Sequence, residues 1–148
     1  MRIGVLALQG AVIEHLKSLR AIGAEALEVR SLAELAAVDA IILPGGESTT
    51  IGMLLARFGL LEPLRQRVKD GMPLWGTCAG MILMANHIED GLPDQPSLGV
   101  MDMVVQRNAF GRQVDSFTAP LSFDFLGAEP FPAVFIRAPL ARSWGEEV

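Results

Sequence analysis

The chain has 148 residues, of which 51% are hydrophobic and 20% are charged, so it can bury one sizeable core and is too short to expect two. Its formal net charge of −5 comes without a basic cluster, which argues against nucleic acid and anionic membranes as partners. The single cysteine excludes an intrachain disulfide, and the two histidines lack the spacing of zinc ligands, so we expect neither a metal nor a cofactor.

The first residues run directly into an apolar segment without the layout of a signal peptide. No apolar run reaches the eighteen or so residues that a bilayer span requires. We therefore expect a cytoplasmic protein that forms one domain over residues 1–148.

Short β-rich apolar runs alternate with helical patterns along the first part of the chain, which is typical of parallel βαβ units. Strands are predicted over residues 2–8, 24–29, 40–44 and 72–76. Helices are predicted over residues 11–23, 31–38, 50–59, 62–71 and 79–88. In the second of these helices, Ser31 and Glu34 have the spacing of a capping box.

The pattern changes after the last predicted helix. Residues 90–99 are predicted to form a loop, and residues 100–110, 113–125 and 133–139 to form strands and turns without a convincing helix. Together these elements predict an α/β fold of the flavodoxin-like type, with three α/β/α layers and a largely parallel sheet.

The only cysteine, Cys78, lies in the stretch Gly76-Thr77-Cys78-Ala79-Gly80, between a predicted strand and a predicted helix. A sharp turn there would expose the side chain at the carboxyl end of the sheet, and it needs small neighbours because the backbone is crowded. The helix would direct N–H groups toward the sulfur, and the N–H of Ala79 toward an oxyanion. This pattern predicts a thiol nucleophile; the alternative is a buried structural cysteine.

A second glycine-rich turn, Pro44-Gly45-Gly46-Glu47-Ser48, follows the third predicted strand. It should meet Cys78 at the carboxyl edge of a parallel sheet, where ligands usually bind. The glycines would let a backbone N–H approach a ligand, and Glu47 and Ser48 offer acceptors for an ammonium group. The alternative is an ordinary turn in which Ser48 or Thr49 caps the next helix. Neither this turn nor Gln9-Gly10 carries a nucleotide-binding motif.

Five stretches resemble the glutaminase subunits of pyridoxal 5′-phosphate synthase, a family of class I glutamine amidotransferases. The resemblance runs from residue 3 to about residue 139. It rests on the stretches GVLALQGAVIEH, ILPGGESTT, WGTCAG, RNAFGRQVDSF and FIRAP. It implies hydrolysis of L-glutamine to glutamate and ammonia, and delivery of the ammonia to a (β/α)8-barrel synthase partner within a hetero-oligomer. That partner makes pyridoxal phosphate from a pentose phosphate and a triose phosphate.

The resemblance also implies a role for each matching residue. Cys78 would form a glutamyl thioester, and the N–H groups of Gly46 and Ala79 would bind the oxyanion. Gln9 would belong to a loop near the site that responds to docking of the synthase. The positions that would hold glutamine are Gly46, Glu47, Ser48, Arg107, Ile136 and Arg137.

The chemistry of glutamine agrees with these roles. Its carboxylate, ammonium and amide require a cation, hydrogen-bond acceptors and an oxyanion hole around a nucleophile. Arg107, Glu47 and the turn at Cys78 could provide one each. Without the resemblance, Arg107 and Arg137 would be interpreted as solvated or structural arginines at strand ends.

The sequence departs from the family in one respect. Members carry a His-x-Glu pair near the carboxyl terminus, in which the histidine is the base that activates the cysteine. No such pair is present, and His15 and His87 are expected at surface or helix-end positions. We therefore expect an incomplete form of the domain that lacks the C-terminal segment of the family and is inactive as it stands.

Two other functions stay open. The chain could be a non-catalytic module that keeps the fold and the surface that binds the synthase. It could also be another thiol hydrolase with an α/β fold, although such an enzyme would need a histidine and an acid downstream of the cysteine. In an intact member of the family, glutamine hydrolysis is expected to depend on docking with the synthase.

Overall fold

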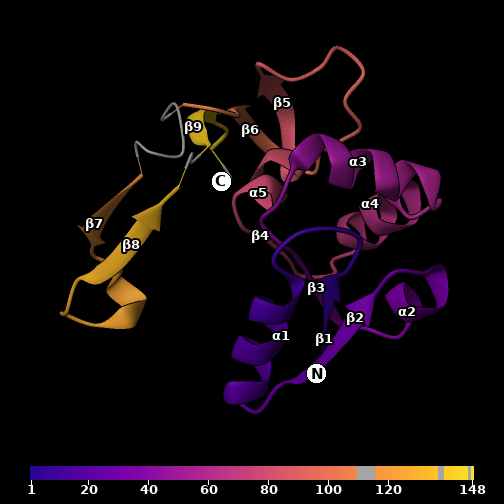
Figure 1. Cartoon of the computed structure of the whole chain (residues 1–148), viewed down its shortest axis with the longest axis horizontal. Coiled ribbons are helices and arrows are strands. Elements are labelled where there is room, and N and C mark those ends of the chain that lie inside the picture. Colours follow the sequence, from indigo (N-terminus) through magenta and orange to yellow (C-terminus); the bar gives the residue numbers. More distant parts are fainter. Residues whose placement is uncertain (110–115, 137–138, 147) are drawn as a thin grey trace.

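The computed structural model describes residues 1–109, 116–136, 139–146 and 148 (Figure 1). Its centre is a sheet of four parallel strands in the order β2-β1-β3-β4. These strands are β1 (Arg2–Leu6), β2 (Glu25–Val29), β3 (Ala40–Leu43) and β4 (Leu74–Gly76). This is the order of a flavodoxin-like sheet, so the predicted fold class is confirmed.

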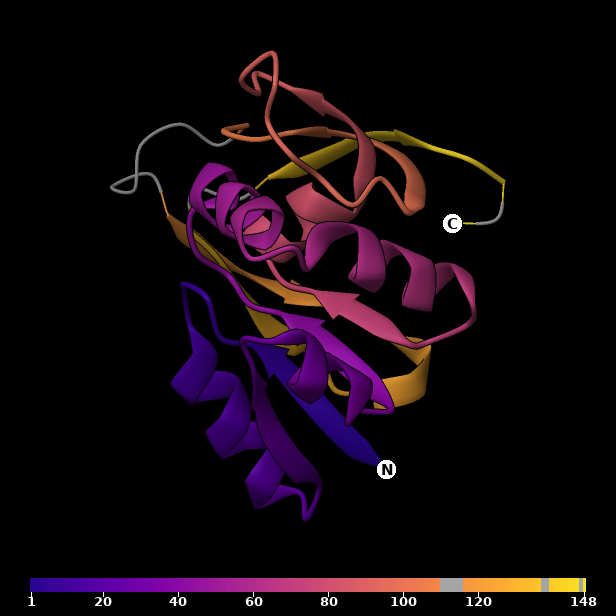
Figure 2. The same ribbon diagram turned by 90° about the vertical axis from the view of Figure 1, so that its right-hand side faces the viewer.

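Helices cover both faces of this sheet, which gives three layers (Figures 1 and 2). Because neighbouring residues of a strand point to opposite faces, Val5 packs with Leu16 and Leu19 on one side while Leu6 joins the larger core on the other. Helix α1 (Val12–Ala21) lies on the first side. The other side holds α2 (Leu32–Ala36), α3 (Ser48–Arg57), α4 (Leu61–Lys69) and α5 (Ala79–Met84).

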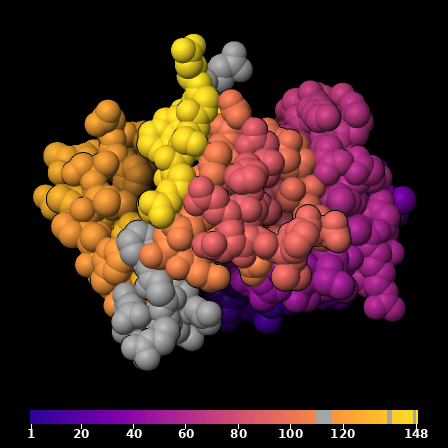
Figure 3. Space-filling model, turned by 90° about the horizontal axis from the view of Figure 1, so that it is seen from above, coloured from indigo at the N-terminus to yellow at the C-terminus, as the bar shows by residue number. Residues whose placement is uncertain are grey.

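The remaining strands form two small sheets. Strand β6 (Met101–Gln106) pairs in parallel with β5 (Ala85–Glu89) and antiparallel with β9 (Leu140–Trp144). A hairpin of β7 (Phe117–Leu121) and β8 (Phe131–Phe135) projects beside them and contains the short 3-10 helix η2 (Asp124–Leu126). Seen from above, β9 in yellow lies between the orange hairpin and the β5 region (Figure 3).

The predicted helix over residues 79–88 is wrong in its second half. Helix α5 ends at Met84, and the next five residues form β5. Ala85 turns extended, with φ −61° and ψ 143°, and is fully buried in a cluster with Ile82 and Met103. A short apolar run such as this one is compatible with a helix or with a buried strand. Here the segment pairs with β6, which stabilises it as a strand. His87 is therefore an exposed residue of a strand and does not end a helix.

The predicted ends of the other helices are confirmed. Gly23, Gly59 and Gly71 follow α1, α3 and α4 with φ angles of 78°, 67° and 97°, which glycine adopts most easily. Ser31 caps α2 by accepting a hydrogen bond from the N–H of Glu34. Among the described helices, none is both long and apolar enough to cross a membrane.

Candidate active site

Cys78 occupies a strained turn between β4 and α5. Its φ of 51° and ψ of −104° lie in a region that residues with a side chain rarely adopt. The thiol is exposed, and the helix begins at the next residue. Strain of this kind persists only where the surrounding structure enforces it, and it concentrates at functional sites.

The small neighbours of Cys78 are required by close packing, as the sequence predicts. A Cβ atom on Gly80 would overlap the carbonyl oxygen of Leu43 at the end of β3. A Cβ atom on Gly76 would overlap the backbone of Gly80 and the sulfur of Met84. The helix therefore packs against the strand ends with no space for larger side chains at these two positions.

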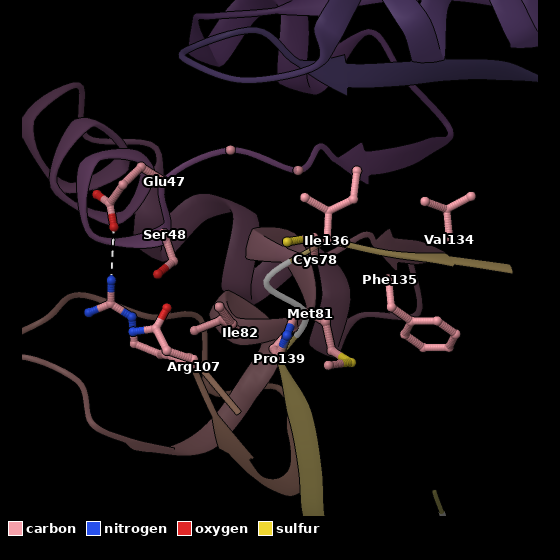
Figure 4. Close-up of a pocket in the computed structure, with 13 residues that line it drawn as sticks. Glu47, Ser48, Cys78, Met81, Ile82, Arg107, Val134, Phe135, Ile136 and Pro139 are labelled. Carbon is pink, nitrogen blue, oxygen red and sulfur yellow. Dashed lines mark hydrogen bonds and ion pairs between the residues drawn. The ribbon is translucent and has the colours of Figure 1, made fainter. Parts of the chain in front are cut away.

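The Gly45-Gly46 turn lies directly against the cysteine. A Cβ atom added to Gly45 would lie 3.5 Å from the Cβ of Cys78. Both residues line a cavity of about 800 Å³ that also includes Arg107 and Ile136 (Figure 4). The structure thus brings the two predicted turns together at the carboxyl edge of the sheet.

Glu47 caps helix α3. Its carboxylate accepts hydrogen bonds from the N–H groups of Thr49, at 3.2 Å, and Thr50, at 2.7 Å, so the alternative of a Ser48 or Thr49 cap is wrong. Partial burial raises the pKa of Glu47, but the hydrogen bonds from Thr50 and Thr49 and the charge of Arg107 outweigh it, so the pKa lies below its ordinary value. Glu47 is therefore a fixed anion at the edge of the cavity.

Arg107 follows β6 and points toward Glu47 on the same side of the cavity (Figure 4). Its Nη2 atom lies 2.9 Å from Oε1 of Glu47, and only 16% of its side chain is exposed. Its Nη1 atom donates a hydrogen bond of 3.1 Å to Oε1 of Gln95. The guanidinium is thus held by residues of two different segments.

The turn after β1 contacts the same site. Oε1 of Gln9 accepts a hydrogen bond of 2.9 Å from the N–H of Glu47. The N–H of Ala11 donates to the carbonyl of Gly45 at 2.9 Å, and a Cβ atom on Gly10 would overlap that carbonyl. The predicted position of Gln9 near the site is therefore found in the structure.

The other predicted site residues differ in where the structure places them. Ile136 lines the cavity and is half exposed, while Arg137 lies outside the described residues. Ser48 is 2% exposed and is the buried polar residue of the described core. Ala79 is also buried, directly after the cysteine.

Two residues of the site region were missed by sequence reasoning. His15 lies in the first turn of α1 and is partly buried, and its Nε2 atom lies 3.1 Å from Oγ1 of Thr77, next to the cysteine, a contact that the sequence did not predict. Gln95 lies in the predicted loop and hydrogen bonds to Ser48 and Arg107. No local motif marks either residue, because each contact joins segments distant in the sequence.

The arrangement can hold a small zwitterion beside a thiol. A cation and an anion lie on one side of the cavity and an exposed cysteine on the other, and the described residues that line it include no histidine. A cysteine on a strained strand-to-helix turn, beside a glycine turn of a parallel sheet, has the geometry of the nucleophile elbow of α/β enzymes, with a thiol in place of the hydroxyl.

The chain belongs to the SNO glutamine amidotransferase family, whose model matches residues 5–148. It is 58% identical to pyridoxal 5′-phosphate synthase subunit PdxT of Herpetosiphon aurantiacus, over 100% of this chain and 78% of that protein. It is also 58% identical to the protein of the same name from Frankia alni, over 99% of this chain and 74% of the relative. The family resemblance seen in the sequence is confirmed.

Comparison with solved structures supports the same family and fold. A crystal structure of a glutamine amidotransferase superposes with a TM-score of 0.88 and 50% identity, covering 97% of this chain and 75% of that one. PurLQS from Thermotoga maritima, at 17% identity and a TM-score of 0.59, shares the fold alone.

Proposed function

We propose that the chain provides the glutamine-binding site and the nucleophile, Cys78, of the glutaminase subunit of a pyridoxal 5′-phosphate synthase. The observation that carries this proposal is the strained, exposed Cys78, which lines one cavity with Gly45 and with the Arg107–Glu47 pair. Relatives that are 55–58% identical bear the name pyridoxal 5′-phosphate synthase subunit PdxT, which supports the choice of substrate and product.

The proposed binding mode assigns one part of L-glutamine to each group of residues. Arg107 would bind the α-carboxylate, and the oxygens of Glu47 and Ser48 the α-ammonium group. The side-chain amide would then lie at Cys78, with its oxygen toward the N–H groups of Gly46 and Ala79. Ile136 lines the cavity, and the family resemblance implies that Ile136 and Arg137 also hold glutamine.

The proposed reaction has two steps. The thiolate of Cys78 attacks the amide carbon, and collapse of the tetrahedral intermediate breaks the C–N bond and releases ammonia, which takes up a proton as it leaves. Water then attacks the glutamyl thioester, which gives glutamate and restores the thiol. Both steps need a group that donates and accepts protons near the sulfur.

A synthase subunit is the proposed partner. It would receive the ammonia inside a hetero-oligomer, and the family resemblance implies that this partner is a (β/α)8 barrel. The contact of Gln9 with the N–H of Glu47 links the turn after β1 to the Gly45-Gly46 turn, so docking there could adjust the oxyanion site. We also propose that residues 1–148 act as one domain in this complex.

Alkylation of the single cysteine tests the substrate site directly. Iodoacetamide should modify Cys78, and L-glutamine should slow the reaction, as measured by mass spectrometry at several glutamine concentrations. L-asparagine, one methylene shorter, should protect less because its amide cannot reach the thiol while its α-groups stay bound. Arg107→Met should weaken protection by roughly tenfold or more, since a charged hydrogen bond to the carboxylate is lost.

The two alternatives predict different results. A different thiol hydrolase would show protection by simple amides or esters and none specific to L-glutamine. A non-catalytic module would form a complex with a synthase subunit of a relative but show no protection by glutamine. An absence of protection by L-glutamine at saturating concentrations would exclude the proposed function.

A further inference from the structure

The loop before β6 places one amide side chain behind the residues proposed to hold glutamine. Oε1 of Gln95 accepts hydrogen bonds from Oγ1 of Thr49, at 3.2 Å, and from Nη1 of Arg107, at 3.1 Å. Its Nε2 atom donates to Oγ of Ser48 at 3.3 Å. One side chain thus joins the start of α3 to the end of β6.

We propose that Gln95 is a positioning residue that sets the place of Arg107 and Ser48 for binding the α-groups of L-glutamine. This inference rests on the proposed function and names the residue that organises that site. Gln95 is not among the described residues that line the cavity, so it acts through the side chains that do.

The orientation of the Gln95 amide follows from its neighbours. An arginine only donates hydrogen bonds, so the oxygen of the amide must face Arg107. The NH2 group is then left for Ser48, which is 2% exposed and needs a partner to offset its burial. A leucine or methionine of similar size would leave both groups without this partner.

Arg107 is held by two acceptors at once. Oε1 of Glu47 accepts a hydrogen bond from Nη2 at 2.9 Å, and Oε1 of Gln95 accepts one from Nη1 at 3.1 Å. Without Gln95, Glu47 would be the one acceptor left to the guanidinium among the residues that the structure describes, and the side chain of Glu47 is itself 48% exposed. The arginine could then turn toward Glu47 or solvent, which would reduce the population that can bind a carboxylate.

The loop that carries Gln95 is fixed on two helices. The carbonyl of Pro96 lies so close to Gly52 of α3 that a Cβ atom there would overlap it. Arg65 of α4 donates to the carbonyls of Ser97, at 2.7 Å, and Leu98, at 2.6 Å. Leu98 itself is fully buried in the main core. A rigid support of this kind is what a positioning residue requires.

The test compares Gln95→Leu with Gln66→Leu. Gln66 lies on the exposed face of α4, where its amide bonds to Asp70, so it provides the same substitution away from the site. The dissociation constant for L-glutamine, measured by calorimetry or by protection of Cys78, should rise roughly tenfold or more in Gln95→Leu. It should stay within about twofold in Gln66→Leu, since that side chain has no contact with the site.

A double-mutant cycle separates positioning from general stabilisation. In an Arg107→Met background, Gln95→Leu should have a much smaller effect on glutamine affinity, because the residue through which Gln95 acts is gone. A purely structural role would lower the melting temperature and leave the dissociation constant and this cycle unchanged. Unchanged affinity in a folded Gln95→Leu variant would overturn the proposal.

Gln95→Glu decides the question if the leucine variant does not fold. A glutamate keeps the size and the acceptor facing Arg107 but adds a negative charge beside it. Affinity for L-glutamine should fall more than affinity for its α-amide, which lacks the carboxylate. Equal losses for both ligands would count against the proposal. If the unaltered chain binds no L-glutamine at all, the proposed function itself has failed.

Discussion

His15 connects the first helix to the residue beside the thiol. Its ring contacts Trp75 edge to face at a centroid distance of 6.0 Å, and its Nε2 atom lies 3.1 Å from Oγ1 of Thr77. Burial lowers the pKa of His15 below its ordinary value, against a smaller opposing effect of Glu14. The neutral ring is therefore favoured in the folded protein.

This shift predicts a dependence of stability on pH. Below pH 6.5, the ordinary value for histidine, the unfolded chain binds more protons at this position than the folded chain. The free energy of unfolding should therefore fall as the pH is lowered through the range between 6.5 and the folded pKa, and the full contribution should be present above 6.5. In His15→Gln this part of the pH dependence should be absent, as measured by urea unfolding at pH 5 to 8.

The control for this experiment is His87→Gln, which changes the exposed histidine of β5. The His15-dependent slope should survive in that variant. An identical pH profile for His15→Gln and the unaltered protein would show that the ring is not buried as the structure places it.

At the scale of elements, the turn between β4 and α5 depends on the absence of side chains. Gly80→Ala should lower the free energy of unfolding by about 1–3 kcal/mol, because the new methyl group overlaps the carbonyl of Leu43 and the helix must shift. Urea unfolding would measure this change. Since Cys78 lies on the same turn, L-glutamine should also protect Cys78 less well from iodoacetamide in this variant.

Gly71→Ala is the control for Gly80→Ala, because it makes the same substitution at a glycine outside the site. Gly71 has φ 97° and no atom within 4 Å of a Cβ atom, so its substitution tests backbone strain alone. It should cost about 1–2 kcal/mol and leave glutamine binding unchanged. A loss of binding that is equal in both variants would mean that the packing at Gly80 is not what shapes the site.

The same elements show what the sequence can predict. The parallel strands, the helix ends at glycine and the strand-to-helix turn follow from local patterns, because each depends on residues close in the chain. Strand β5 could not be separated from α5, since the pairing of Ala85 with Met101 lies outside the local window. The alternative considered for the glycine turn was a cap by Ser48 or Thr49, since serine and threonine are more common N-caps than glutamate, but Glu47 caps α3.

The residues of the site also fall into those that the local sequence predicts and those that it does not. Cys78 and the Gly45–Ser48 turn are marked by glycine, which signals an unusual backbone. Gln95 and His15 carry no such mark: their partners lie 12 to 62 residues away in the sequence, and only the fold brings them together.

For the whole molecule, the cavity supplies binding groups and a nucleophile, but the described residues that line it include no histidine. The sequence holds two histidines: one bonds to Thr77 and the other is exposed on β5. We expect the 148-residue chain to release little glutamate from glutamine, even with a synthase subunit. General acid–base assistance is worth about a hundred- to ten-thousand-fold, and the members of a catalytic unit fail together.

A chain extended with the His-x-Glu segment of a relative tests this expectation. Mixed with synthase and L-glutamine, the extended chain should form glutamate about a hundred- to ten-thousand-fold faster than residues 1–148, and Cys78→Ala should abolish the gain. Ammonium salts should support pyridoxal phosphate formation by the synthase alone, which shows that the synthase is active in both mixtures. Comparable glutamate release by the two chains would require a base within residues 1–148, and His15, through Thr77, would then be the first residue to substitute.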